Sequence, residues 1–494
     1  MKRKIVIIGG GIGGLSAGIY AIKAGFDAEI YEKNPTAGGE CMGWNRKGCH
    51  IDNCIHWLTG TDPSTSVWQV WNTLGAIDRD TPYAPTVKFY SSRLDGKEAT
   101  LWNDLDRTEK ELIALSPEDE AEIRKFIEHV RYAESCVIPG EKPMDMMGIG
   151  DYIRMGKSMA NMPKVMKEYG SIDLNGLAER FRSPLLKKLM TDYLPPEYTA
   201  YSFLVSYATM TSGNGSIPLG GSLAMAERII GKFRAMGGKL YTKTPVKRIL
   251  TEDKKAVGIE LESGERVKAD IVISAVDPAF LFGSLIDRAY MPKEFAAAYD
   301  SRKSYPVISG FQIAYVTDDT FSGEDTIFFD CAPINIGKRS FGRIYLKNYA
   351  YDKSFAPEGK TVIQTNIPQS DEDFLYWKSL SKEEYRAKKE ELVKAVTERI
   401  EKEFPELAGK AELLDCWTPL TYERYCNAYH GAYMAFTTTV GAKQLKVKGT
   451  LKGLDNFYMA GQWVMSPGGL PIAAISGKFA IQRILRKEKR DIDI

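Results

Sequence analysis

One uncharged, glycine-rich stretch near the start of the chain, IVIIGGGIGGLSAGIYAI at residues 5–22, constrains the fold more than any other feature. Basic residues precede it, so a secretion signal or a membrane anchor is one interpretation. Its glycines argue against both, because each weakens a helix and no small-residue cleavage site follows the run. The remaining interpretation is a strand, a tight turn and a helix that open a nucleotide-binding domain.

This interpretation explains the glycines position by position. Residues 4–8 form a short β-branched run, as expected for a strand buried on both faces of a parallel sheet. Gly9, Gly11 and Gly14 then fit the spacing G-x-G-x-x-G. The first glycine permits the sharp turn, the second lets the backbone approach a pyrophosphate, and the third lets the following helix pack on the strand. That helix would point its N-terminal N–H groups at the phosphates.

Two later features indicate which dinucleotide binds. A second strand is expected over residues 28–32 and ends on Glu32, about twenty positions after Gly11, where a carboxylate accepts ribose hydroxyls. Gly38 and Gly39 follow, and they would let the chain pass close to the pyrophosphate a second time, which suits an extended FAD. We find no second G-x-G-x-x-G between a strand and a helix, which disfavours a reductase with its own NAD domain.

Composition limits the remaining possibilities. A chain of 494 residues has room for roughly three domains. Its 66 basic and 64 acidic residues give a net charge of only +2, so no overall field favours nucleic acid as a partner. The 7 cysteines are scattered without a C-x-x-C pair, which is typical of free thiols in a reducing compartment. We therefore expect a cytoplasmic location and no metal site.

Three separated blocks carry a family resemblance: the N-terminal segment through about Gly60, which includes KNPTAGGECMGW, residues 215–278, which begin GSIPLGGSLAMAERI, and residues 456–485, which begin NFYMAGQWVMSPGGLPIAAISGKF. With them the chain resembles the flavin-dependent phytoene desaturases, carotenoid isomerases and retinol saturases, within the amine oxidase superfamily. The resemblance implies an α/β fold with a Rossmann-like FAD-binding domain of the glutathione-reductase type. It implies that residues 1–60, 215–278 and 441–494 form that domain. Residues 61–214 and 279–440 would form an inserted α+β substrate domain.

The resemblance also implies which residues hold FAD. At Glu40 family members carry an arginine, and at Gln462 the superfamily usually has an acid, so this chain departs at both positions. The helix after Gly469 would begin beneath the isoalloxazine ring and stabilise negative charge on the reduced flavin. The complete set of expected cofactor-binding residues is Gly9, Gly11, Ile12, Gly13, Gly14, Glu32, Lys33, Gly38, Gly39, Glu40, Val246, Gly461, Gln462, Gly469, Leu470 and Pro471.

The family's chemistry implies a function. Flavin N5 would exchange a hydride with a carbon of an apolar, polyene or isoprenoid-like lipid, in desaturation or saturation. The direction, the electron donor or acceptor and the oligomeric state stay open. The alternatives are a double-bond isomerase without net redox change, an amine oxidase with an aromatic cage formed by Tyr433 and Trp463, and a flavin-free binding module of the same fold.

Three residues are candidates for catalysis. His56 and His430 lie in family-like segments expected to approach the flavin ring, where either would donate or relay a proton, or else hydrogen-bond structurally. Tyr433 is a further candidate. The segment that contains His430 and Tyr433, TPLTYERYCNAYHGAYMAF at residues 418–436, is expected on the substrate side.

Methionines recur at helical spacing after Asp151, at Met155, Met159, Met162 and Met166, among cationic residues. One interpretation is a cap helix whose methionines fill the core. The other is a basic amphipathic lip that rests on a membrane surface and admits a lipid, which would make the protein a peripheral membrane binder.

Overall fold

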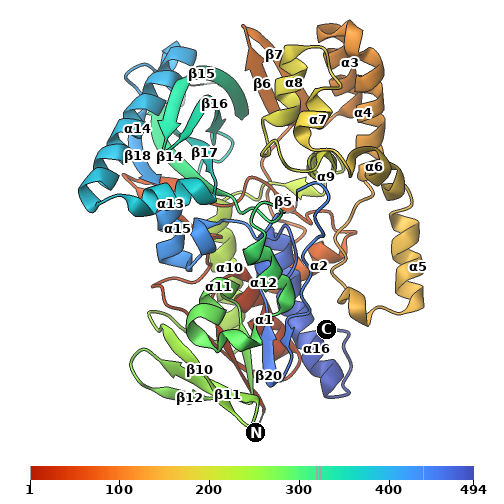
Figure 1. Ribbon diagram of the computed structural model, residues 1–494, viewed down its shortest axis with the longest axis vertical. Coiled ribbons are helices and arrows are strands. Elements are labelled where there is room, and N and C mark those ends of the chain that lie inside the picture. Colours follow the sequence, from red (N-terminus) through yellow and green to blue (C-terminus); the bar gives the residue numbers. More distant parts are fainter. Residues whose placement is uncertain (1, 319–320, 322–324, 438) are drawn as a thin grey trace.

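A nine-stranded sheet occupies the lower part of the computed structural model, which describes residues 2–318, 321, 325–437 and 439–494 (Figure 1). Two short strands lie off its main path, where β12 pairs with β11 and β19 pairs with β20. The strands, in spatial order and then with these two, are β10 (Val246–Glu252), β11 (Lys255–Leu261), β20 (Leu454–Met459), β13 (Ile271–Ser274), β1 (Lys4–Ile8), β2 (Asp27–Tyr31), β9 (Lys239–Tyr241), β12 (Arg266–Lys268) and β19 (Thr450–Leu451).

The centre of this sheet joins the front, the middle and the tail of the chain. β1 runs parallel to β2 on one side, with Ile7 opposite Ile30, and parallel to β13 on the other, with Ile7 opposite Ile273. β13 in turn runs parallel to β20. The three isoleucine side chains are fully buried, as the run of β-branched residues predicts for a sheet covered on both faces.

Helices α1 (Ile12–Lys23), α10 (Gly221–Ala235) and α16 (Gly469–Lys487) pack beside this sheet (Figure 1). α1 and α16 touch at backbone distance, because a Cβ on Gly477 would lie 2.7 Å from the carbonyl oxygen of Gly13. The Ser16 hydroxyl donates to the carbonyl of Ala474 at 2.6 Å across the same contact. The last helix of the chain is therefore fixed against the first.

A second sheet of seven strands lies above (Figure 1). Its pairs are antiparallel except β15 with β6. In order, its strands are β18 (Glu412–Trp417), β14 (Ser309–Asp318), β17 (Lys360–Gln369), β16 (Arg339–Asn348), β15 (Thr326–Ile336), β6 (Lys88–Leu94) and β7 (Lys97–Trp102). One face carries a core with α13 (Asp371–Ser379) and α14 (Lys382–Glu403), in which Ile344 and Leu346 meet Trp377 and Val396. The next residues along β16, Tyr345 and Lys347, consequently point to the opposite face.

Helices surround the end of this second sheet at β6 and β7 (Figure 1). The remaining elements are α2 (Ser66–Leu74), α3 (Leu105–Leu115), α4 (Glu120–Ala133), α5 (Ile149–Ser158), α6 (Met162–Tyr169), α7 (Leu174–Ala178), α8 (Pro184–Thr191), α9 (Ala200–Thr211), α11 (Pro278–Phe280), α12 (Lys293–Asp300), α15 (Pro419–Cys426), β3 (Gly43–Arg46), β4 (Cys49–Asp52), β5 (Leu58–Thr59) and β8 (Gly215–Ser216).

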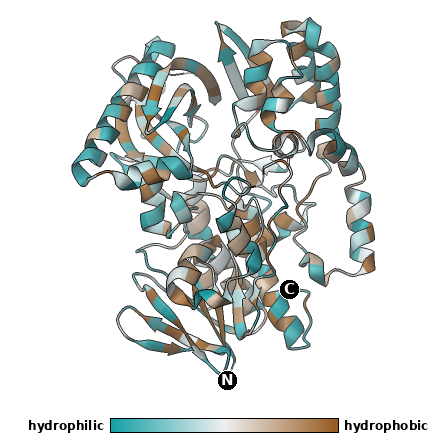
Figure 2. Ribbon diagram, viewed as in Figure 1, coloured by the Kyte–Doolittle hydropathy of each residue, from teal (hydrophilic) through white to brown (hydrophobic). Residues whose placement is uncertain are grey.

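The methionine-rich region forms two helices, α5 and α6, where the sequence suggests one. Pro163 lies in the first turn of α6, a position that needs no backbone N–H, so it starts a helix instead of bending one. Met162 is buried, whereas Met166 is 48% exposed, so only part of the methionine series fills the core. α5 stands apart from the body, and hydrophobic residues alternate with hydrophilic ones along it (Figures 1 and 2).

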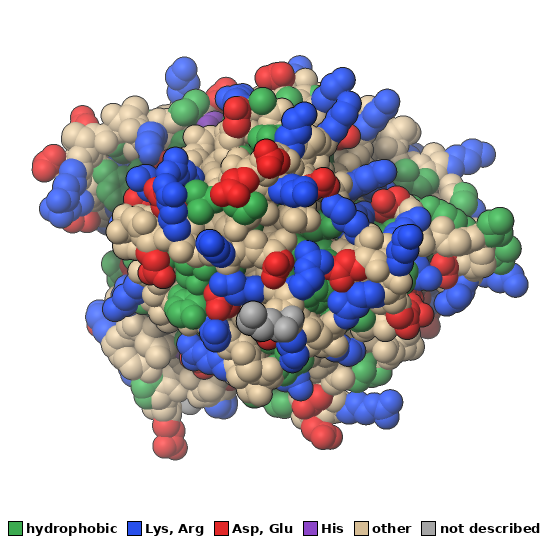
Figure 3. All heavy atoms as spheres, turned by 90° about the horizontal axis from the view of Figure 1, so that it is seen from below, with side chains coloured by type: hydrophobic (Ala, Val, Ile, Leu, Met, Phe, Trp, Pro, Cys, Tyr) green, Lys and Arg blue, Asp and Glu red, His purple; other side chains and the backbone are tan. Residues whose placement is uncertain are grey.

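Charge is mixed on the lower surface of the molecule. Basic and acidic side chains are interspersed over the face seen from below (Figure 3). This distribution agrees with the net charge of +2 and provides no single-sign field for a polyanionic partner on that face.

Candidate cofactor cleft and its substrate side

A cleft of about 1150 Å³, including space open to solvent, lies where the first, middle and last segments of the chain meet. It runs from the ends of β1 and β2 past the glycine turn to the start of α16. Of the sixteen expected cofactor residues, those that border it are Gly9, Gly11, Ile12, Gly13, Glu32, Lys33, Gly38, Gly39, Glu40, Val246, Gly461, Gln462, Gly469 and Leu470. Gly14 and Pro471 are not among its bordering residues.

The glycine turn is built from backbone contacts. Gly9 has a φ of +95°, and a Cβ on Gly14 would overlap the Gly9 carbonyl oxygen. A Cβ on Gly13 would lie 2.7 Å from the Cα of Gly461, and one on Gly39 would lie 3.1 Å from the Cα of Gly11. Gly14 therefore acts on the shape of the turn, while Gly13 and Gly39 let separate chain segments approach one another at backbone distance beside the cleft.

Glu32 and Lys33 mark the far end of the cleft. The Glu32 carboxylate accepts hydrogen bonds from the backbone N–H groups of Gly10 and Asn34, both at 2.8 Å, and this fixes it at the end of β2. The Lys33 ammonium turns to the end of α15, where it donates to the Asn427 side-chain oxygen at 2.6 Å. Lys33 thus ties α15 to the nucleotide end.

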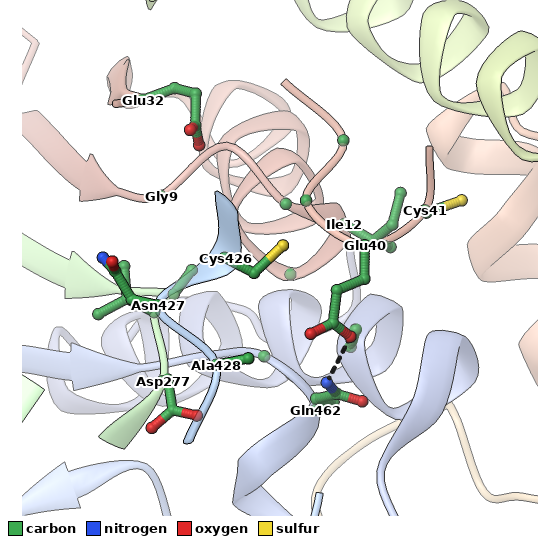
Figure 4. Close-up of a pocket in the computed structure, with 18 of the residues that line it drawn as sticks. Gly9, Ile12, Glu32, Glu40, Cys41, Asp277, Cys426, Asn427, Ala428 and Gln462 are labelled. Carbon is green, nitrogen blue, oxygen red and sulfur yellow. Dashed lines mark hydrogen bonds between the residues drawn. The ribbon is translucent and has the colours of Figure 1, made fainter. Parts of the chain in front are cut away.

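Glu40 and Gln462 form a pair at the other end, near the start of α16 (Figure 4). The Gln462 amide donates from Nε2 to Glu40 Oε2 at 3.1 Å and accepts at Oε1 from the Gly469 backbone N–H at 3.0 Å. Burial raises the pKa of Glu40 to about 8, so the carboxyl is neutral at pH 7. The two departures from the family pattern therefore fit together. With Glu40 present, an acid at position 462 would place two carboxyl groups side by side, whereas the Gln462 amide donates a hydrogen bond to Glu40.

Asp277 is a bordering residue that sequence reasoning missed. Its carboxylate accepts from the backbone N–H groups of Ala279 at 2.7 Å and Tyr429 at 2.8 Å, and burial raises its pKa to about 7. The Asp-Pro pair directly after β13, at the start of α11, was the available signal. Three further missed residues, Cys426, Asn427 and Ala428, also border the cleft (Figure 4).

The arrangement fits an extended dinucleotide. Ile12 and Gly13, in the first turn of α1, border the cleft, and first-turn N–H groups have no partner within their helix. Such groups bind phosphate oxygens, and the glycines on either side admit the backbone of a ligand. The start of α16 borders the same cleft at its other end.

The three catalytic candidates have different surroundings. Tyr433 borders the cleft, and burial raises its pKa to about 12. His430 is not a bordering residue. Its Nδ1 lies 2.7 Å from Asp371 Oδ1, and its ring stacks on Tyr429 and on Phe374, so it has a hydrogen-bonding and packing environment of its own.

His56 lies near Lys347 and is not among the residues that border the cleft. Its side chain is exposed, yet burial lowers its pKa to about 3, with the charge of Lys347 acting in the same direction. An accessible side chain and a strongly lowered pKa are compatible if the accessible surface of His56 faces the interior of the protein and not the outer surface. Within the described ranges no group of three or more His, Cys, Asp or Glu side chains is arranged to hold a metal ion.

Comparison with known proteins shows the family to which the chain belongs. The family model of flavin containing amine oxidoreductase matches residues 12–485. The chain belongs to this family. Prolycopene isomerase 2, chloroplastic, from an Oncidium hybrid cultivar is 26% identical over 97% of this chain and 83% of the relative. All-trans-retinol 13,14-reductase from Homo sapiens is 22% identical over 100% of this chain and 88% of the relative.

A solved structure shows the same fold. The crystal structure of an oxidoreductase from Methanosarcina mazei superposes with a TM-score of 0.59 at 18% identity, over 97% of this chain and 100% of that one. This flavin containing amine oxidoreductase family member is an FAD-dependent oxidoreductase, as the sequence predicts.

Proposed function

We propose that this enzyme acts on a carbon–carbon bond of a long, mostly apolar molecule of the polyene or isoprenoid kind. The observation that carries the proposal is an aromatic wall on the substrate side. It comprises Trp57, Phe89, Tyr193, Phe328 and Tyr345, whose rings contact one another at centroid distances of 4.4–6.4 Å.

The wall borders an enclosed space. Tyr193 and Tyr345 are only half-buried, yet burial raises the pKa of both hydroxyls strongly. Partial exposure together with strong desolvation is expected for side chains that line an internal cavity. Tyr433, which borders the cofactor cleft, influences the pKa of both, so the aromatic wall approaches the cleft at Tyr433. An extended apolar substrate fits such a surface, because rigid aromatic rings bind it without polar cost.

FAD supplies the hydride chemistry when bound. The cleft residues named above would hold it, with Glu32 at the ribose end and the Glu40–Gln462 pair near the start of α16. The chain's own work is to exclude water, to hold the substrate along the aromatic wall, and to manage one proton. Tyr433 keeps its hydroxyl proton at neutral pH and would donate from it, whereas His56, with a pKa of about 3, stays neutral and is too weak a base to hold a proton there.

The names of the relatives include an isomerase and a reductase, so they differ in reaction type. The reaction that this chain catalyses therefore has to be tested directly. The test is anaerobic photoreduction of the purified flavoprotein, followed by addition of polyenes, retinoids, unsaturated fatty acids or quinones. We expect a polyene to restore the oxidised flavin spectrum and to leave a product heavier by two hydrogens. If no polyene or isoprenoid changes the spectrum of either the reduced or the oxidised flavin and none is converted to a product, the proposal is wrong.

Product mass distinguishes the alternatives. A product of unchanged mass indicates an isomerase, and a lighter product from oxidised enzyme indicates desaturation. An amine oxidase is the less favoured alternative, because the cationic Lys347 on the substrate side disfavours a positively charged amine.

We also propose that residues 1–60, 215–278 and 441–494 act as the FAD domain, with the intervening residues as the substrate domain. The supporting observation is that all strands of the nine-stranded sheet come from the first set and all strands of the seven-stranded sheet from the second, within the described part of the chain.

A membrane contact through α5 belongs to the same proposal. Ile149 is 82%, Tyr152 44% and Ile153 54% exposed, and Arg154 and Lys157 lie on the same helix. No helix in the described ranges is long and apolar enough to span a bilayer. Apolar and basic residues together suit an interfacial contact. Ile149→Ser combined with Ile153→Ser should weaken sedimentation with anionic vesicles, and equal sedimentation of variant and parent would contradict it.

A further inference from the structure

A single buried ammonium group stands out on the substrate side of the molecule. Lys347 lies on β16, on the face opposite the α13–α14 core, and is only 4% exposed. Its backbone neighbours are Thr326 on β15 and Gln364 on β17. Among the residues that the structure describes, no carboxylate forms an ion pair with its ammonium and no acceptor forms a hydrogen bond with it. Its one recorded contact is with the ring of Tyr349, 4.7 Å from the ring centroid.

Nearby acids are engaged elsewhere. Asp52 influences the charge state of Lys347, but its carboxylate already accepts from the Ser222 backbone at 2.6 Å, the Ser222 hydroxyl at 2.7 Å, and the backbone of Cys54 at 3.0 Å. Asp325 also raises the pKa of Lys347 without forming an ion pair with it. The buried cation is therefore not explained by the fold.

A second polar group beside Lys347 lacks a partner. The Nε2 atom of Gln364 is buried without a hydrogen bond in the described structure, while its Oε1 accepts from the Tyr349 hydroxyl at 3.1 Å. Because Gln364 and Lys347 are paired across adjacent strands, their side chains lie on the same face. The ammonium and the amide N–H are thus two neighbouring donors without an acceptor. Burying such donors costs free energy unless a ligand accepts hydrogen bonds from them.

His56 and the aromatic wall are neighbours of these donors. The charge of Lys347 lowers the pKa of His56, so the two groups are close enough to interact. Two positions before Lys347 on the same strand face, Tyr345 belongs to the aromatic wall. This face of β16 therefore combines an aromatic surface with one cationic group.

We propose that the substrate is amphipathic and carries a carboxylate, which Lys347 and Gln364 bind while its apolar body lies along the aromatic wall. This inference rests on the proposed function and names its substrate class more closely. One ammonium and one amide donor match the single charge and two oxygens of a carboxylate. A hydrocarbon would leave both donors unsatisfied.

The test measures binding, so that it does not depend on turnover. Full-length, FAD-loaded protein is titrated with a fluorescent long-chain conjugated polyene acid, its primary alcohol and its methyl ester. We expect the acid to bind at least about tenfold more tightly than the alcohol, as one buried charge-assisted contact provides. Lys347→Met should abolish that preference and leave alcohol binding within about twofold.

Two further variants control the result. Lys360→Met removes an exposed lysine at the start of β17, which pairs with Asp318 at 2.8 Å, and this variant should retain the preference for the acid. Lys347→Gln keeps a hydrogen-bond donor without the charge, and it should lose the preference for the acid as Lys347→Met does. It provides a second measurement if the methionine variant fails to load FAD.

Equal binding of acid and alcohol by the parent protein would overturn the inference, as would a preference that survives both Lys347 substitutions. Tighter binding of the alcohol's phosphate ester than of the acid would contradict the carboxylate assignment. Turnover of polyene hydrocarbons without any acid preference would overturn this inference alone. An acid preference without flavin turnover of any polyene would overturn the proposed function alone.

Discussion

At the nucleotide end of the cleft, chain segments meet because side chains are missing, whereas at its other end and on the substrate side, ionisable side chains are buried. The turn from Gly9 to Gly14 and its neighbour Gly39 leave backbone atoms at contact distance. Glu40 is desolvated beside Gln462, and Lys347 is desolvated beside Tyr349. Steric fit constrains the residues of the glycine turn, whereas desolvation controls the protonation states of Glu40 and Lys347.

This difference predicts how substitutions in the two regions affect stability. A side chain added at the glycine turn has no room, so its effect does not depend on pH. The ionised forms of Glu40 and Lys347 would have opposite charges, and burial disfavours the charged form of each. Their contributions to stability should therefore change with pH in opposite ways, which provides a direct test of the comparison.

The largest effect is expected at the glycine turn. Gly14→Ala places a methyl group against the Gly9 carbonyl, so we expect a loss of at least about 4 kcal/mol of unfolding free energy and no FAD retention. Gly231→Ala, inside α10 with no neighbour near the added methyl, is the matched control and should not destabilise the protein. Urea unfolding and the flavin absorbance of purified protein measure both. Yellow, stable Gly14→Ala protein would refute the account of the turn.

Glu40→Gln should show a strongly pH-dependent gain in stability. The pKa of Glu40 is raised from 4.5 to about 8 in the folded protein, so between these values the folded state holds a proton that the unfolded state releases. Parent stability therefore falls with rising pH in this window relative to the variant, by about 1.4 kcal/mol per pH unit. Urea unfolding of the apoprotein at several pH values measures the difference. Glu390→Gln, exposed on α14, should show no such trend, and a flat difference for Glu40→Gln would contradict the prediction.

Lys347→Met should behave in the opposite sense. The pKa of Lys347 is lowered from 10.5 to about 8, so the folded state disfavours the ammonium and its cost is fully present below about pH 8. As pH rises toward 10.5 the parent recovers this cost, and the advantage of the variant shrinks by about 1.4 kcal/mol per pH unit. We expect the ligand-free variant to be more stable than the parent at pH 7 by about 1–4 kcal/mol. A less stable variant would show that Lys347 is structural.

The smallest effect concerns the Glu40–Gln462 pair. A double-mutant cycle of Glu40→Leu and Gln462→Leu at pH 6 should give a coupling of about 1 kcal/mol, the net worth of one hydrogen bond. Chemical unfolding of the four proteins measures it. Additive effects would mean that Gln462 acts only through Gly469, whose N–H it accepts.

Much of the fold was readable from local pattern. The β-branched run at residues 4–8 becomes β1, and the spacing of Gly9, Gly11 and Gly14 becomes the turn into α1, because these positions act through neighbours in sequence. The methionine region was less readable. Helical spacing continues across Met159–Met162, yet the chain forms two helices there, since Pro163 suits a first turn.

The cleft was only partly predictable. Fourteen of the sixteen expected cofactor residues border it, because glycines and motif acids have fixed positions relative to their own strand or helix. Asp277, Cys426, Asn427 and Ala428 were missed, since they reach the cleft only when α11 and α15 pack against the first segment. His430 was expected near the ring system; the structure pairs it with Asp371 and does not place it among the bordering residues, and its role in catalysis stays a prediction.

The sequence alone determined the βαβ unit, its glycine turn and the acid at Glu32, because each depends on contacts within about thirty residues. The three-segment assembly followed from the family resemblance. Only the tertiary structure decided that Glu40 is neutral, that Gln462 bridges it to α16, and that Lys347 is a buried cation to which the described residues offer no ion pair. Burial and charge state depend on every group that packs around a side chain, and those groups come from distant parts of the chain.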